Sequence, residues 1–359
     1  MKRIGLLTGG GDAPGLNAVI RAVVYAARRA GDGQVLGIRN GFDGLIDPEA
    51  PRPLVEHDVR GLLSRGGTIL GAANRGNPFA RRARRDGVEV VEDHSDRVVE
   101  NLERLQLDAL IVVGGDGTLR ISRELAEKGC PVVGVPKTID NDVGGTDVTF
   151  GYDTAVNTAV EALDRLHTTA ESHHRVMVVE LMGHQAGFLA LAAGVAGGAD
   201  GILIPEIPFG YEPLLEAVSA RRAAGRSFSV LAVAEGAYPV GGEQVIARPG
   251  DAVHFARLGG VGAAVAERLA ERSQLETRVT VLGHLQRGGS PSAFDRWLAT
   301  RFGVAAVALA MRGLHGRMVA LRGREIVDVP LAEALAVPKR VDPQGSEVAA
   351  ARALGIAFG

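Results

Sequence analysis

Two short loops in the middle of the chain carry aspartates in turns that are suited to binding phosphate. Gly114–Thr118 contains Asp116, and Lys137–Asp142 contains Asp140 and Asp142. Backbone amides at the start of a helix bind anions. A carboxylate in the same turn is unfavourable beside a bare polyphosphate unless a divalent cation lies between them. The spacing therefore predicts phosphate chemistry with a metal ion, or with a proton to be moved, where the three aspartates meet.

Each acidic loop follows a short apolar run that is typical of a buried strand. Residues 109–113 and 131–135 are continuous, short and rich in β-branched side chains. From Thr118 onward the apolar residues recur at helical spacing, so the amides of Gly115–Thr118 are expected at a helix N-terminus. Ligands bind at the carboxyl ends of the strands in an open α/β sheet. Both loops are therefore expected to contribute to one site.

Two further turns at strand ends are rich in glycine. Gly9–Gly15 follows a predicted strand at 3–7, and three consecutive glycines favour a ligand against the backbone. Pro14 stands where a dinucleotide fingerprint needs its last glycine, and no Walker-type G-x-x-x-x-G-K-[ST] motif occurs. Near the C-terminus, Leu282–Gly289 carries a histidine and an arginine, which suit a phosphorylated ligand.

The composition is that of an ordinary globular protein. The 359 residues are 46% hydrophobic and 23% charged, and the net charge of −2 gives no reason to expect nucleic acid or an anionic membrane as a partner. The single cysteine, Cys130, excludes an intramolecular disulfide and a multi-cysteine metal site. The apolar stretch at the N-terminus is too short for a signal peptide, and no apolar run approaches the roughly 20 residues that cross a bilayer. These features predict a cytoplasmic protein.

Strands and helices alternate along the chain, which predicts an α/β protein with more than one parallel sheet layer. The length suggests two or three domains, or one large two-lobed enzyme. The arginines of the stretch 81–85 are interpreted as the solvated face of a helix.

Taken together, the motifs resemble those of the 6-phosphofructokinase family, and the resemblance covers nearly all of the chain. The turn Gly114–Thr118 alone is only moderately specific, since NAD kinases and lipid kinases carry a similar one. The resemblance becomes specific when Thr-Ile-Asp-Asn-Asp and Gly-His-Leu-Gln-Arg-Gly-Gly follow in this order. The motifs are Gly10–Gly15, Gly114–Thr118, Lys137–Asp142, Met182–Gly183 and Leu282–Gly289.

The resemblance implies an α/β fold of two three-layer α/β/α lobes with mostly parallel sheets and an active site in the cleft between them. The larger, donor-nucleotide-binding lobe would comprise residues 1–151 and about 286–337. The smaller lobe, which would bind fructose 6-phosphate, would comprise about 152–285 and 338–359. The active enzyme is expected to be a homo-oligomer, either a tetramer or a dimer.

The resemblance also implies a reaction, the phosphorylation of the 1-hydroxyl of fructose 6-phosphate in glycolysis. Asp140 would be the general base, and a carboxylate among other carboxylates can hold a pKa high enough for this task. Asp116 and Asp142 would hold Mg²⁺, and Thr138 would touch the transferring group beside Gly10. The residues assigned to the ATP site are Gly10, Asn74, Arg75, Gly115, Asp116, Gly117 and Thr118.

A second set of residues would hold fructose 6-phosphate. Two of its arginines, Arg175 and Arg278, would reach across from a neighbouring subunit. The full set is Thr138, Ile139, Asp140, Arg175, Met182, Gly183, His184, Glu235, Arg278, His284, Leu285, Gln286 and Arg287.

Donor choice depends on two positions, and they point in different directions. Gly117 leaves room for ATP where an aspartate goes with pyrophosphate, whereas Lys137 is typical of pyrophosphate users. The combination resembles the mixed-substrate group, and ATP is favoured with pyrophosphate as the alternative. His184 and Asn74 replace arginines that are usual in the family, which keeps a non-catalytic sugar-phosphate sensor as an alternative. An NAD-kinase-like activity is the remaining one.

Overall fold

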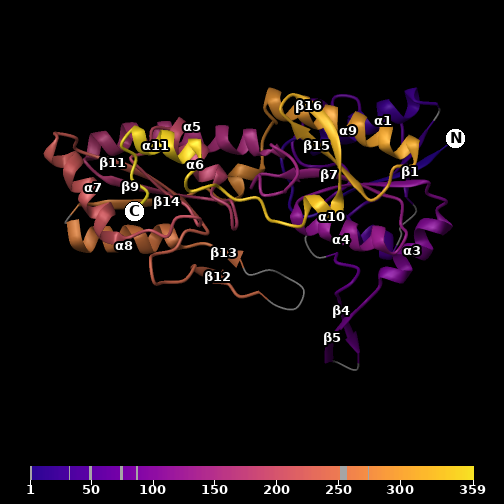
Figure 1. The fold of residues 1–359 in the computed structure, drawn as a ribbon, viewed down its shortest axis with the longest axis horizontal. Coiled ribbons are helices and arrows are strands. Elements are labelled where there is room, and N and C mark those ends of the chain that lie inside the picture. Colours follow the sequence, from indigo (N-terminus) through magenta and orange to yellow (C-terminus); the bar gives the residue numbers. More distant parts are fainter. Residues whose placement is uncertain are drawn as a thin grey trace.

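The computed structural model describes residues 2–31, 33–47, 51–72, 76–85, 88–250, 257–273 and 275–359. It is built around two open sheets that lie side by side, each covered by helices (Figure 1). The larger sheet has the strand order β16-β15-β7-β6-β1-β2-β3, with β8 beside β7. Its strands are β1 (Arg3–Thr8), β2 (Gln34–Gly37), β3 (Arg52–Leu54), β6 (Ala109–Gly114), β7 (Val132–Thr138), β8 (Phe150–Gly151), β15 (Arg317–Arg322) and β16 (Glu325–Pro330).

The centre of the larger sheet is parallel, and its side chains alternate between two apolar layers. In β6, Ile111 packs with the helices on one face and Leu110 with those on the other. Helices α1 and α9 cover the first face, and α3 and α4 cover the second (Figure 1). The helices of this part are α1 (Leu16–Arg29), α2 (Asp43–Ile46), the 3₁₀ turn η1 (Leu62–Ser64), α3 (Ser95–Arg104), α4 (Asp116–Glu127), α9 (Ala293–Arg312) and α10 (Leu331–Ala334).

The smaller sheet has four parallel strands in the order β10-β11-β9-β14. Helices α5, α6 and α11 cover one face, and α7 and α8 cover the other. The predicted α/β class with mostly parallel sheets is thus confirmed. The elements are α5 (Tyr152–His173), β9 (Val176–Leu181), α6 (Phe188–Ala196), β10 (Gly201–Leu203), α7 (Tyr211–Ala223), β11 (Ser229–Ala234), α8 (Val261–Ser273), β14 (Thr277–Val281), the 3₁₀ turn η2 (Gly283–Arg287) and α11 (Ser346–Ala353).

Two antiparallel hairpins project from these layers, and one of them corrects the sequence analysis. The stretch Arg81–Arg85 is the strand β4, paired with β5 (Val88–Glu92), and not a helix face. A run of like charges has no period of its own, so only the pairing across the hairpin, which includes an Arg85–Glu92 ion pair of 2.6 Å, reveals the strand. The second hairpin joins β12 (Ile246–Arg248) to β13 (Arg257–Leu258) beside the smaller sheet.

A buried carboxylate joins the helix layers of the two sheets. Asp295, in the first turn of α9, is 0% exposed and accepts hydrogen bonds from the backbone N–H groups of Gly151 (2.9 Å) and Thr154 (2.8 Å). Those groups lie at the start of α5, where a helix leaves N–H groups without partners. Burial raises the pKa of Asp295 to about 6. Asp295 therefore caps α5 from a helix of the larger sheet.

Among the described residues, no helix is both long enough and apolar enough to cross a membrane.

We predict that Asp295→Ala lowers the free energy of unfolding by about 1–3 kcal/mol, because two buried N–H groups lose their acceptor. Denaturant unfolding measures the loss. Asp164→Ala, at an exposed position of α5, is the matched control and should stay near the wild type. Equal stability of the two variants would contradict the capping role.

Candidate active site

Three loops meet at the carboxyl ends of the neighbouring strands β1, β6 and β7. Thr118, in the first turn of α4, packs against the first two of these loops. A Cβ on Gly114 would lie 2.3 Å from the Thr118 Cβ, and one on Gly9 would lie 2.7 Å from the Thr118 Cγ2. Both positions therefore need glycine for a close approach. The packing brings the Gly9–Gly15 loop against the N-terminus of α4.

Lys137 lies at the end of β7 and is only 2% exposed. Its ammonium group donates a hydrogen bond to the Gly9 carbonyl oxygen (3.1 Å) and another to that of Gly11. Burial, and then the nearby charge of Arg287, lowers the pKa of Lys137 to about 8. Lys137 thus fixes the glycine-rich loop that follows β1 through two of its carbonyl oxygens, a role that the sequence did not show.

Asp140 follows β7 in a tightly fixed turn. Its backbone N–H donates to the Thr138 Oγ1 (3.1 Å), and the neighbouring Asn141 has a φ of 54° and accepts from the Thr149 N–H (3.1 Å). The Asp140 Oδ1 is buried and has no hydrogen-bond partner among the described residues. A buried acceptor without a donor is costly, so this oxygen fits a ligand that brings a hydroxyl group.

The acidic side chains lie close enough to repel one another. Burial, the charge of Asp140 and the charge of Asp116 together raise the pKa of Asp142 to about 7. Asp116 is partly neutralised by Arg120, whose Nε lies 2.7 Å from the Asp116 Oδ2. The sequence analysis missed Arg120, although its i,i+4 spacing from Asp116 was a usable signal.

The acidic cluster fits a magnesium ion that is completed by its ligands. Among the described residues, no three His, Cys, Asp or Glu side chains are placed to hold a metal ion on their own. Mg²⁺ usually keeps several waters and takes one or two carboxylates together with substrate phosphates. Asp116 and Asp142 provide two carboxylates whose repulsion a divalent cation would relieve.

Loops of the smaller sheet form the facing part of the site. The Met182 N–H donates to the Gln286 Oε1 (2.9 Å), and the His184 N–H donates to the Glu235 Oε1 (3.0 Å). Gly183, between them, has a φ of 142°, which only glycine adopts readily. The ends of β9 and β11 and the turn η2 are thereby joined.

Two charged groups link the facing loops to the rest of the site. Arg287, in η2, donates to the Asp12 carbonyl oxygen (3.1 Å) in the glycine-rich loop that follows β1. Burial raises the pKa of Glu235 to about 7, and the charge of Asp140 acts in the same direction. The charge of Asp140 is therefore felt at Glu235, across the two parts of the site.

The structure separates several predicted residues from this cluster. Arg175 forms an ion pair of 2.9 Å with Glu276, and Arg278 pairs with the same carboxylate on the edge strand β14. His284 and Leu285 are exposed in η2, whereas Gln286 is buried. Asn74 and Arg75 lie outside the described residues.

Comparison with known proteins places the chain among phosphofructokinases. The family model described as "Phosphofructokinase" matches residues 3–310. The ATP-dependent 6-phosphofructokinase of Chloroflexus aurantiacus is 56% identical over 358 residues, which are 100% of this chain and 98% of the relative. The pyrophosphate–fructose 6-phosphate 1-phosphotransferase of Amycolatopsis methanolica is 52% identical, and the match spans 97% of this chain and 98% of that relative.

A solved structure agrees with these sequence relatives. The phosphofructokinase of Saccharomyces cerevisiae matches 94% of this chain with a TM-score of 0.78 and 34% identity. This chain spans 45% of the length of the yeast chain.

We predict a pH-dependent difference in stability between the wild type and Glu235→Gln. The folded-state pKa of Glu235 is raised from 4.5 to about 7, so between these values the folded protein binds more protons than the unfolded chain. The wild type should therefore lose stability relative to the variant as the pH rises through this window. Denaturant unfolding of both proteins at about pH 5 and about pH 8 tests this. If the difference in the free energy of unfolding between them is the same at both pH values, burial does not raise the pKa of Glu235.

Proposed function

The chain belongs to the phosphofructokinase family, and from this premise we propose that it transfers the terminal phosphoryl group of ATP to the 1-hydroxyl of fructose 6-phosphate. The observation that carries the proposal is the buried Oδ1 of Asp140, for which the described part of the chain offers no hydrogen-bond partner. The NAD-kinase-like and sensor alternatives do not account for a relative that matches over the whole chain and is named for this reaction.

In the proposed reaction, Asp140 takes the proton of the 1-hydroxyl as that oxygen bonds to the terminal phosphorus. The bond between this phosphorus and the bridging oxygen breaks, and ADP leaves. Thr138 orients the Asp140 turn through its Oγ1. On the facing side, hydrogen bonds join the Met182 N–H to Gln286 and the His184 N–H to Glu235. Met182, Gly183 and Glu235 lie on the loops so joined and are suited to hold the sugar hydroxyls.

Asp116 and Asp142 would hold Mg²⁺, which supplies a positive charge that screens the phosphates during transfer. Arg120 holds the Asp116 Oδ2 at 2.7 Å and so orients that carboxylate. Gly10 and the amides of Gly115–Thr118 would contact the donor phosphates, because they lie on the loops that Thr118 packs together.

ATP is the proposed donor, and pyrophosphate is the second candidate. Gly117 adds no side chain to the start of α4, which leaves space for a nucleotide. The Lys137 ammonium is engaged by carbonyl oxygens of the loop after β1, so it need not signal a pyrophosphate site. Pyrophosphate stays a candidate because a relative that is 52% identical is named for that donor.

We further propose that the active form is a homo-oligomer, a dimer or a tetramer, in which Arg175 and Arg278 serve the site of a neighbouring subunit. The edge strand β14 leaves Val281 59% exposed, and Leu285 in the following turn is 69% exposed. Apolar side chains on an open strand edge favour a protein partner. Fructose 6-phosphate would then be held by His284 and Arg287 of one subunit and by the two arginines of the next.

We propose that the two lobes, each built on one sheet, bind different substrates. The larger lobe, 1–151 with about 286–337, carries the three loops assigned to the donor. The smaller lobe, about 152–285 with 338–359, carries the loops assigned to the sugar phosphate. The cytoplasmic location inferred from the sequence stays a prediction.

We predict that the protein phosphorylates fructose 6-phosphate with ATP, and that kcat/KM with ATP exceeds that with pyrophosphate by at least about tenfold, since a side chain that would crowd the nucleotide is missing at Gly117. Product formation with the two donors, measured side by side, checks this. A preference for pyrophosphate would overturn the donor assignment, and no turnover with either donor would overturn the function.

We predict that Asp140→Asn lowers kcat by about 10²–10⁴-fold, because the proton acceptor is lost, and that Arg278→Ala weakens binding of the sugar phosphate. If Arg278 serves a neighbouring site, mixed oligomers of the two variants should recover part of the activity, since some sites then have both groups. Mixing after partial denaturation and refolding tests this, with each variant refolded alone as the control. No recovery in verified hybrids would place Arg278 in the site of its own subunit.

A further inference from the structure

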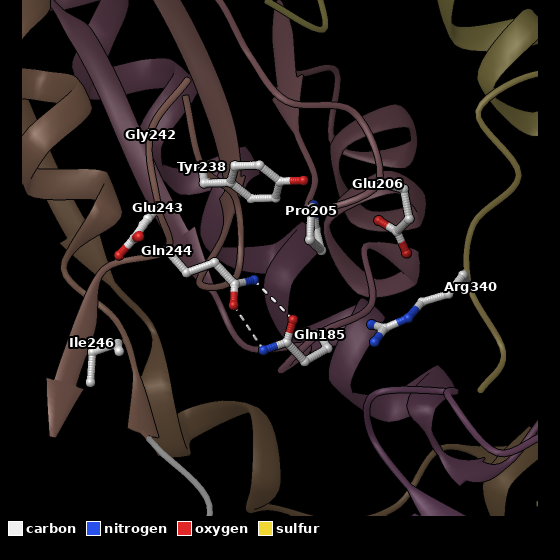
Figure 2. A pocket seen from close by; sticks show the side chains of 9 residues that line it. All are labelled: Gln185, Pro205, Glu206, Tyr238, Gly242, Glu243, Gln244, Ile246 and Arg340. Atoms are coloured by element: carbon white, nitrogen blue, oxygen red, sulfur yellow. Dashed lines mark hydrogen bonds between the residues drawn. The ribbon is translucent and has the colours of Figure 1, made fainter. Parts of the chain in front are cut away.

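A cavity of about 600 Å³ lies beside the loops that follow β9 and β11, which carry proposed fructose 6-phosphate residues. A pair of glutamines forms one of its walls (Figure 2). Gln185 belongs to the loop after β9, and Gln244 belongs to the segment that leads into β12. Of the residues assigned above to the donor or to fructose 6-phosphate, none that the structure describes lines this cavity. The glutamine pair therefore needs an explanation that the proposed reaction does not supply.

The two side-chain amides form a reciprocal pair. The Gln185 Nε2 donates to the Gln244 Oε1, and the Gln244 Nε2 donates to the Gln185 Oε1, both at 2.9 Å (Figure 2). The Gln244 Nε2 also donates to the Gly236 carbonyl oxygen at 2.7 Å. An amide nitrogen has two hydrogens, so the Gln244 amide uses its full donor capacity to hold two separate loops.

Both of these loops carry proposed substrate residues. Gln185 directly follows His184, and Gly236 directly follows Glu235. The loops also touch each other, because the His184 N–H donates to the Glu235 Oε1 (3.0 Å) and a Cβ on Gly236 would lie 2.2 Å from the His184 carbonyl oxygen. Gln244 is thus the third member of a contact on which the placement of His184 and Glu235 depends.

The segment that carries Gln244 is itself anchored to β9. After β13, the N–H groups of Gly260 and Gly262 donate to the Glu180 carboxylate at 2.9 and 2.8 Å, and Glu180 is only 4% exposed. Glu180 and Gln185 lie on either side of Met182 in the sequence. The start and the end of the β12–β13 hairpin are therefore both fixed to the strand and loop that present Met182 and Gly183.

We propose that Gln244 is a positioning residue for the fructose 6-phosphate site, which fixes the 182–187 and 235–237 loops relative to each other without touching the substrate. This inference rests on the proposed function. The amide pair borders an open cavity and lies outside the apolar clusters. Water can therefore replace the Gln244 amide when it is removed, so its loss should relax the loops and leave the fold intact.

The test compares both Michaelis constants in Gln244→Ala with those of the wild type. We expect KM for fructose 6-phosphate to rise about tenfold, because three hydrogen bonds of modest net strength are lost. KM for ATP and the melting temperature should stay close to the wild-type values. Gln244→Glu, of the same shape, places a carboxylate oxygen against the Gly236 or Gln185 oxygen and should have at least as large an effect.

Two further variants separate positioning from other causes. Glu243→Gln changes an exposed neighbour that lines the same cavity, and it should leave both Michaelis constants unchanged. Gln185→Ala should also raise KM for fructose 6-phosphate, because it removes both bonds of the amide pair. The double variant should be little worse than Gln244→Ala, which already lacks this contact.

The outcomes distinguish this inference from the proposed function. If the wild type does not phosphorylate fructose 6-phosphate, the proposed function fails. If the wild type is active and Gln244→Ala and Gln244→Glu both keep the wild-type KM for fructose 6-phosphate, the positioning role is wrong. An equal rise in both Michaelis constants together with a fall in melting temperature would show a merely structural role and would also overturn it.

Discussion

The structure of the site depends on the crowding of like charges at the carboxyl edge of the larger sheet. Burial and the neighbouring carboxylates raise the pKa of Asp142 to about 7, while Lys137, buried below the same loops, has its pKa lowered to about 8. Such a set of charges is stable only if fixed partners hold each member. Carbonyl oxygens hold Lys137, and Arg120 holds Asp116. In the proposed reaction, Asp116 and Asp142 would take the cation and Asp140 would take the proton.

The smaller sheet lies beside this charged edge, and specific contacts join the two parts. Asp295 caps α5 from α9, and Arg287 reaches the loop after β1. In the smaller sheet, the His184–Glu235 contact and the glutamine pair hold the loops that are proposed to bind the sugar phosphate. Each of these contacts joins segments that are more than fifty residues apart in the sequence. The geometry of the site therefore forms only when the two sheets and their helices have packed.

Local patterns were sufficient for much of the fold and for many of the proposed site residues. Short β-branched runs predicted the strands around 109–113 and 131–135, and the structure has β6 and β7 there. Local patterns were misleading where a segment has no regular spacing of apolar residues. The arginines at 81–85 form a strand because they pair with β5. It also missed Arg120, whose importance depends on the direction of Asp116.

Residue types and their local spacing were enough to identify the turns expected to bind phosphate, the carboxylates expected to bind a metal ion or a proton, and the family to which their order belongs. Those features are local, since they depend on residue type and on spacing within a strand–turn–helix unit. The folded chain alone shows that Lys137 supports the glycine-rich loop, that Arg175 and Arg278 both pair with Glu276 beside the edge strand β14, and that Gln244 joins two loops. Burial and hydrogen-bond partners arise when distant segments pack, and no short stretch of sequence contains that information.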